Sequence, residues 1–175
     1  VMGGLRPGVA EPMTEAAKLE VRGHWLHVAE ASGQSFSDQA MSQPGFTYDT
    51  DPAARAVVVI RRERPDLALD YLGAIQHAFY GEGRDVTQEQ VLSDILAEVV
   101  PGADIGAFQA NWRSEDARNE TWADYAISQK AGVTGFPTLV GGPDESGQYG
   151  AVTRGFAPAQ QVLPVLADWI GRPMH

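Results

Sequence analysis

The stretch Gly132-Val133-Thr134-Gly135-Phe136-Pro137-Thr138-Leu139-Val140 connects a helical pattern to the first clear strand pattern in the chain. Gly132 suits the left-handed position at which many helices end. The Phe136–Pro137 bond lies in a turn that enters a strand, and cis X–Pro bonds typically occur in tight turns. We therefore expect this bond to be cis. The residues Thr138, Leu139 and Val140 then favour a strand.

The segment after this stretch predicts a β-hairpin and a helix. A loop rich in Gly, Pro and Asp over 141–147 separates the first strand from a second strand pattern at Gln148–Arg154. Pro158 can open a final helix that reaches Ile170. Two strands alone form a marginal sheet in water, so we expect the hairpin to need more sheet than these residues supply.

The segment before this stretch predicts a block of helices, because start and stop signals bracket apolar residues with helical spacing. The expected helices cover about 14–32, 52–62, 65–80, 87–100, 104–112 and 114–131. In the second of these, the run Val57–Ile60 favours a strand by propensity, but Asp51 as a capping carboxylate and Pro52 supply a helix start. We predict a buried helix there. Thr87 and Gln90 are expected to form a capping box.

Charge and composition exclude several classes of function. The 175 residues carry 13 Lys and Arg against 23 Asp and Glu, a net charge of −10 that repels nucleic-acid phosphates and anionic lipid. No run approaches the roughly 18–20 apolar residues that span a bilayer, and Val1–Ala10 lacks a signal-peptide pattern, so we expect a cytoplasmic protein without a membrane partner. The chain has no cysteine, which removes a disulfide, a Cys-based zinc site and a thiol nucleophile.

Several segments resemble, in the same order, the FrnE-type branch of the DsbA-like thioredoxin-fold family. They are Gly-Gly-Leu-Arg-Pro-Gly at Gly3–Gly8, Tyr-Asp-Thr-Asp-Pro-Ala at Tyr48–Ala53, Ala-Phe-Tyr-Gly-Glu-Gly-Arg-Asp-Val at Ala78–Val86, the turn Gly135–Thr138, and Gly155-Phe156 ahead of Pro158. The resemblance implies an α/β, thioredoxin-like fold in a single domain over 1–175. Its core parts would be 1–12 and 131–175, and about 13–130 would be a mainly helical insertion.

The same resemblance implies a thiol–disulfide oxidoreductase or isomerase that acts on protein or peptide thiols and disulfides. In this family a cis-proline turn faces the active site, which makes Gly135, Phe136, Pro137 and Thr138 candidate substrate-binding residues. Backbone groups in such a turn can pair with an extended substrate. We expect no cofactor, and the resemblance leaves open whether the chain forms a homo-oligomer.

Three residues outside the turn are further candidates for the border of the substrate groove. Arg6 lies in the glycine-rich loop, and a solvated loop arginine is its simpler interpretation. His24 and Trp25 are the other two, and their simpler interpretation is a half-buried packing pair. His24 and His27 have helical spacing but lack a third ligand, so we expect no metal site. Trp112 and Trp122 are expected to be core aromatics of the helical block.

Two features depart from the family pattern. The family's Cys-x-x-Cys lies at the N-terminus of the first core helix, and no residue here corresponds to that strand-helix unit, so we expect the unit to be missing from this chain. A second cysteine that often follows Pro-Ala in related sequences is replaced by Ala54. The resemblance therefore implies a chain with no catalytic residue, inactive in dithiol exchange as it stands.

Two other functions remain open at this stage. A redox-inactive thioredoxin-fold module could bind peptides through the same turn without sulfur chemistry. A relative of kappa-class glutathione transferases or of 2-hydroxychromene-2-carboxylate isomerases would share the fold. Those proteins typically carry Phe-Trp-Gly after the hairpin, where Thr153-Arg154-Gly155-Phe156 stands here.

Overall fold

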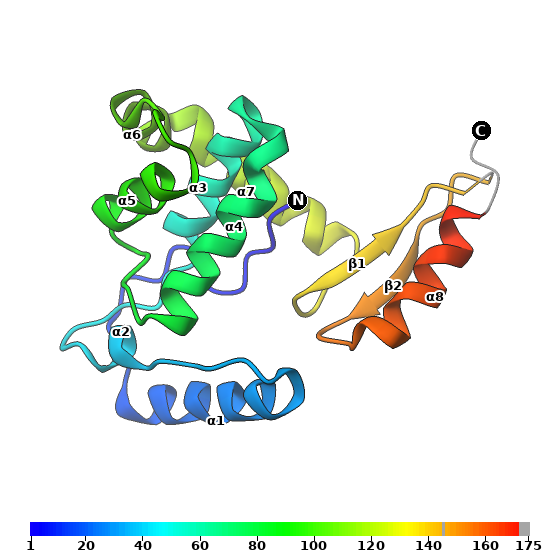
Figure 1. Cartoon of the computed structure of the whole chain (residues 1–175), viewed down its shortest axis with the longest axis horizontal. Coiled ribbons are helices and arrows are strands. Elements are labelled where there is room, and N and C mark those ends of the chain that lie inside the picture. Colours follow the sequence, from blue (N-terminus) through cyan, green and yellow to red (C-terminus); the bar gives the residue numbers. More distant parts are fainter. Residues whose placement is uncertain (145, 172–175) are drawn as a thin grey trace. The chain divides into compact units, whose positions relative to one another are not determined.

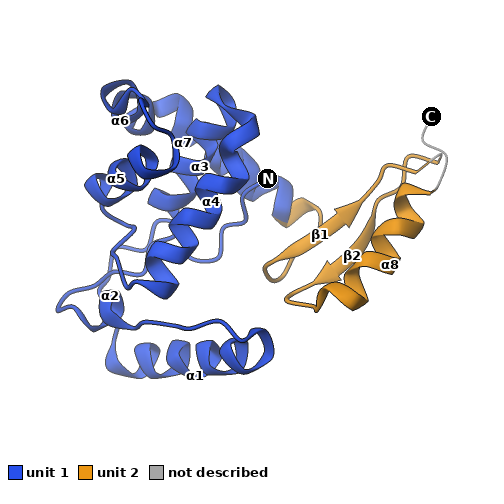
Figure 2. Ribbon diagram, in the orientation of Figure 1, with its two compact units in different colours: residues 1–128 blue, residues 129–175 orange. Residues whose placement is uncertain are grey.

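The structure, a computed structural model, describes residues 1–144 and 146–171 and divides into two compact units, Val1–Ser128 and Gln129–His175 (Figure 2). Unit 1 contains α1 (Glu15–Ser32), α2 (Gln39–Ser42), α3 (Asp51–Glu63), η1 (Pro65–Leu67), α4 (Ala68–Gln76), η2 (His77–Gly81), α5 (Glu89–Val99), α6 (Ile105–Arg113) and most of α7 (Glu115–Lys130) (Figure 1). Unit 2 contains β1 (Thr138–Gly141), β2 (Gly150–Arg154) and α8 (Ala159–Ile170). The chain is thus mainly helical with a small two-stranded sheet.

Helix α3 forms the centre of unit 1, where it packs against α4, α5 and α6. Its residues Val57, Val58, Val59 and Ile60 are all buried. Burying one such side chain contributes about 1.5–3 kcal/mol, whereas the helix propensity of a β-branched residue costs less than about 0.7 kcal/mol. Tertiary burial therefore overrides the strand propensity, and the predicted helix is confirmed.

Asp51 was expected to cap α3, and that assignment is wrong. The cap residue is Thr50, and Asp51 already belongs to the helix. Its carboxylate pairs with the guanidinium of Arg55 one turn later and accepts a hydrogen bond from the Tyr125 hydroxyl at 3.4 Å. The Arg55 guanidinium in turn lies 4.8 Å from the centroid of the Trp112 ring. The carboxylate therefore anchors α3 to α6 and α7 and does not close the first turn of α3.

The predicted capping box at α5 is also wrong. The cap residue of α5 is Gln88, and no side chain bonds there as a cap. The carboxylate of Asp85 accepts hydrogen bonds from both the backbone N–H and the hydroxyl of Thr87, at 3.0 and 2.6 Å. Asp side chains readily form such local turns. The hydrogen bonds to Asp85 therefore engage the Thr87 groups that the capping box would have needed.

The other expected helix starts hold. Thr14 caps α1 by accepting a hydrogen bond from the Ala17 N–H at 3.2 Å, and Gly33 ends that helix in the left-handed conformation. Ser114 accepts from the Ala117 N–H at the start of α7. One core assignment fails, because the Trp122 side chain is exposed.

Unit 2 is a hairpin covered by one helix. β1 and β2 pair in antiparallel register, with an irregularity between Leu139 and Val140. The Trp169 indole of α8 lies close against Gly141 and Gly150, which face each other across the hairpin. A Cβ atom at Gly141 would lie 2.8 Å from that ring. The two glycines thus make room for the tryptophan, and the predicted hairpin and final helix are both confirmed.

Across residues 1–144 and 146–171, none of the helices is long and apolar enough to cross a lipid bilayer.

Candidate functional site

The turn Gly135–Thr138 precedes β1 in unit 2. The Phe136–Pro137 peptide bond is cis, as the sequence predicts. The Thr138 hydroxyl donates to the Gly135 carbonyl oxygen at 2.7 Å, which closes the turn. The Pro137 carbonyl oxygen accepts from the Gly155 N–H at 2.7 Å, which fixes the turn to the end of β2. The Phe136 side chain is exposed and can contact a ligand.

The hairpin offers strand edges next to this turn. The sheet has two strands. In the described part of unit 2, β1 therefore pairs with β2 along one edge, and its other edge has no strand beside it. A strand edge of this kind can add an extended peptide through backbone hydrogen bonds, while side-chain positions on alternate residues give specificity. The turn and the adjacent strand edge therefore offer backbone hydrogen-bonding groups.

Arg6 belongs to a loop that is fixed to the start of α3. Its backbone N–H donates to the Thr50 hydroxyl at 3.2 Å, and its carbonyl oxygen accepts from the Thr50 N–H at 3.1 Å. The guanidinium carbon lies 5.3 Å from the centroid of the Tyr48 ring, within the range of a cation–π contact. Arg6 is therefore held by the chain around Tyr48 and is not a freely solvated side chain.

His24 and Trp25 point to different environments. The His24 side chain is 74% exposed, and its nearest carboxylate is that of Glu20 at 3.9 Å. Trp25 is buried, and its ring contacts those of Phe36, Phe79 and Tyr80. The expectation of a half-buried pair is wrong, because neighbouring residues on a helix surface face different directions.

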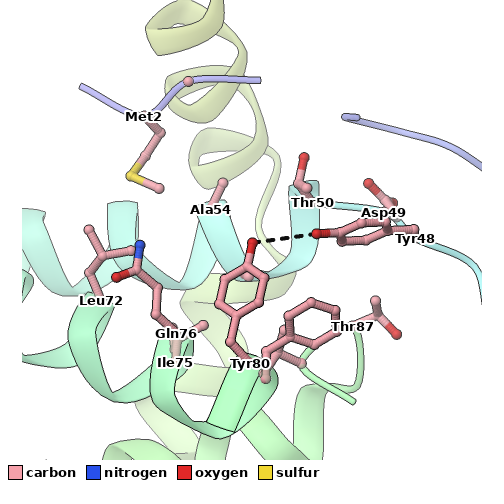
Figure 3. A pocket seen from close by; sticks show the side chains of 14 residues that line it. Met2, Tyr48, Asp49, Thr50, Ala54, Leu72, Ile75, Gln76, Tyr80 and Thr87 are labelled. Atoms are coloured by element: carbon pink, nitrogen blue, oxygen red, sulfur yellow. Dashed lines mark hydrogen bonds between the residues drawn. The ribbon is translucent and has the colours of Figure 1, made fainter. Parts of the chain in front are cut away.

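A cavity of about 150 Å³ lies in unit 1 between the N-terminal loop, the start of α3 and the end of α4 (Figure 3). Most of its wall is apolar, and several polar side chains also line it. The lining residues are Met2, Gly3, Tyr48, Asp49, Thr50, Ala53, Ala54, Leu72, Ile75, Gln76, Phe79, Tyr80, Val86 and Thr87.

The hydroxyl groups of Tyr48 and Tyr80 meet in this cavity at 3.4 Å (Figure 3). Burial raises the pKa of Tyr48 far above its ordinary value, and the neighbouring Tyr80 raises it further, because an anion there would lack solvent. The Tyr48 hydroxyl therefore carries its proton at neutral pH. Each of the two hydroxyls can donate one hydrogen bond and accept others, so the pair can bind an uncharged polar group.

Tyr80 belongs to a π-helical turn, η2, in which the Glu82 N–H bonds to the His77 carbonyl oxygen at 3.1 Å. The wider turn is held from outside by the Ser37 N–H, which donates to the Tyr80 carbonyl oxygen at 2.7 Å. Single π-helical turns occur frequently at functional sites. The position of the tyrosine in the cavity is thus fixed by a local break in the helix.

Sequence reasoning did not identify the cavity, although its signal was present. Three of the segments that carry the family resemblance, Gly3–Gly8, Tyr48–Ala53 and Ala78–Val86, each contribute residues to the lining. Ala54, which stands where related sequences often have cysteine, lines it as well. The pattern indicated importance, but the meeting of residues 32 positions apart could not be read from spacing.

No three His, Cys, Asp or Glu side chains come together as a potential metal site in the described residues.

Comparison with known families settles the relationship. The family model of the DSBA-like thioredoxin domain matches residues 26–156. The chain belongs to this family. No curated protein matches it in sequence.

Solved structures of similar fold include proteins from two bacteria. A protein from Nitrosomonas europaea, provisionally assigned as a protein disulfide isomerase, has a TM-score of 0.85 and 28% identity, and the match covers 94% of this chain and 78% of that one. The cytosolic disulfide reductase DsbM from Pseudomonas aeruginosa has a TM-score of 0.71 and 22% identity over 95% of this chain and 77% of its own. DsbM with GSH gives a TM-score of 0.69 at the same identity and coverage. The DsbM likeness concerns the fold alone.

Proposed function

We propose that this DsbA-like chain serves a thiol–disulfide oxidoreductase or isomerase of FrnE type, and that it supplies the part that binds the peptide substrate. The turn Gly135–Thr138 carries the proposal. It combines an exposed Phe136, a closed backbone and an adjacent strand edge. Those features suit an extended peptide held through its backbone.

The protein-disulfide isomerase assignment of the Nitrosomonas europaea protein supports this choice of substrate class. The arrangement that we propose has 1–12 and 131–175 as thioredoxin-like core parts and about 13–130 as a helical insertion. A cytoplasmic location belongs to the proposal too, and the cytosolic DsbM supports it. Arg6, His24 and Trp25 stay predictions as groove residues, and Trp25 would need a rearrangement because it is buried.

The 175 residues cannot perform the exchange alone. Thiol–disulfide exchange passes through a mixed disulfide formed by a thiolate, and the chain has no cysteine. A Cys-x-x-Cys at a helix N-terminus would supply that thiolate, because the free N–H groups and the helix dipole lower the thiol pKa. In the proposed enzyme this dithiol faces Pro137.

The test compares the chain with a version extended before Val1 by a designed strand and a Cys-x-x-Cys helix. We expect the extended protein to reduce insulin and the original chain not to. Replacing both cysteines by serine should abolish the activity. Pro137→Ala should lower it by about tenfold or more, since a small displacement of bound substrate costs that much. Pro143→Ala, in the loop of the same hairpin, is the matched control and should leave it unchanged.

An extended protein that folds but stays inactive would rule out the oxidoreductase proposal. The absence of cysteine favours a second candidate in that case, a redox-inactive module that binds peptides through the same turn. The unextended chain should then bind a cysteine-free unfolded peptide, and Pro137→Ala should weaken that binding while Pro143→Ala does not.

A further inference from the structure

We propose that the cavity between α3, α4 and η2 binds a small, uncharged aromatic group that carries a hydroxyl, with the ring on the apolar wall and the hydroxyl at Tyr48 and Tyr80. This inference concerns unit 1 and does not depend on the proposed function. It rests on the size, the charge and the hydrogen-bonding groups of the cavity.

The size and wall of the cavity suit one aromatic ring. Its volume of about 150 Å³ equals that of apolar protein cavities that accept benzene. Leu72, Ile75, Phe79 and Val86 supply aliphatic and aromatic surface around it. A longer ligand would have to extend into solvent.

The one carboxylate that lines the cavity disfavours an anionic ligand. Asp49 is the one lining residue with a charge. Its Oδ1 atom already accepts hydrogen bonds from the backbone N–H groups of Gly8 and Asp51, at 2.8 and 2.9 Å. The nearby Arg6 guanidinium lies against the Tyr48 ring. A neutral ligand therefore loses the least solvation on entry.

The two tyrosine hydroxyls supply the specific contact. Their separation of 3.4 Å is longer than the usual 2.7–2.8 Å of an O–H···O bond, so the pair is weakly bonded. Among the described residues, neither hydroxyl makes any other hydrogen bond. A ligand hydroxyl near both oxygens can accept from one and donate to the other, which recovers capacity that the protein leaves unused.

The test measures binding of p-cresol and toluene to the full chain by ligand-observed NMR and calorimetry. We expect p-cresol to bind in the millimolar range or tighter, as its few atoms allow. Tyr80→Phe should weaken p-cresol about fivefold, the value of one hydrogen bond, and should leave toluene unchanged. Ala54→Leu should abolish binding of both by filling the cavity. Tyr149→Phe in unit 2 is the matched control and should change neither.

Failure of the wild-type chain to bind p-cresol at about 10 mM would overturn the proposal. It would also fall if a folded Ala54→Leu variant bound p-cresol as the wild type does. If that variant does not fold, an unchanged p-cresol affinity in Tyr80→Phe overturns it.

N-acetyltyrosinamide, measured in parallel, distinguishes the two sources of such a group. Binding of this compound supports a tyrosine side chain of a peptide as the natural ligand. Binding of p-cresol without it supports a free phenolic molecule.

Discussion

The helical unit and the hairpin unit hold their structures by different means. All the side chains that are buried among the described residues lie in Val1–Ser128, and the hairpin unit has none. In the hairpin unit, exposed apolar side chains such as Leu163 and Ile170 lie on a helix that contacts β2. Local hydrogen bonds and one tryptophan against two glycines fix that unit. Stability in this chain is therefore concentrated in the unit that holds the tyrosine cavity.

Truncating a large apolar side chain should show the largest difference in stability between the two units. Leu92→Ala removes a fully buried side chain of α5, and we expect the free energy of unfolding of unit 1 to fall by about 2–5 kcal/mol. Leu163→Ala removes the same atoms from an exposed position of α8, where the change should stay within about 0.5 kcal/mol. Urea unfolding followed by circular dichroism measures both. Equal effects would contradict the contrast between the units.

A smaller effect is expected where the hairpin unit is closely packed. Gly150→Ala would place a Cβ atom against the Trp169 ring, and backbone adjustment should cost the hairpin about 1–3 kcal/mol. Hydrogen exchange of the β1 and β2 amides should then speed up. Gly73→Ala is the control, because no atom lies near its Cβ position and it should stabilise α4 slightly. Unchanged exchange in Gly150→Ala would show that Trp169 does not hold the unit.

The difference between the units also explains what the sequence could predict. Helix α3 was predictable because Pro52 and the spacing of Ala56 and Ile60 agreed with burial, although Val57–Ile60 alone favoured a strand. The hairpin turn was predictable because its signals are local. The start of α5 was not, because the Asp85 carboxylate accepts hydrogen bonds from the Thr87 N–H and hydroxyl, the groups that the expected capping box required.

The cavity depends on contacts between residues that are far apart in the sequence. Several of its residues could be named from the sequence, but their contact could not be predicted. Tyr48 and Tyr80 both stood in segments of the family resemblance, but their meeting requires the π-helical turn η2, which leaves no signature in the spacing of apolar residues. His24 and Trp25 show the opposite case. Adjacent in sequence, they suggested one site, yet one is exposed and the other is buried.

The smallest expected effect concerns alkaline pH and the buried tyrosines of the helical unit. Burial raises the pKa of Tyr71 above its ordinary value of about 10, because the ionised form would lack solvent in the core. Its hydroxyl donates to the Leu92 carbonyl oxygen at 2.8 Å. Above pH 10 the unfolded chain releases this proton and the folded chain keeps it. The folded state then binds more protons, so its stability falls as pH rises.

The loss due to Tyr71 begins at the unfolded pKa of about 10 and grows by up to about 1.4 kcal/mol per pH unit until the folded pKa is reached. Below pH 10 this residue contributes no pH dependence. Tyr71→Phe removes the ionisable group, so its free energy of unfolding should fall less steeply between pH 10 and 11 than that of the wild type, although it is less stable at neutral pH because the Leu92 carbonyl oxygen loses its partner. Urea unfolding at several pH values measures the two slopes. Identical slopes would mean that Tyr71 ionises inside the folded unit, and that the core around α4 and α5 admits water that the burial of Tyr71 excludes.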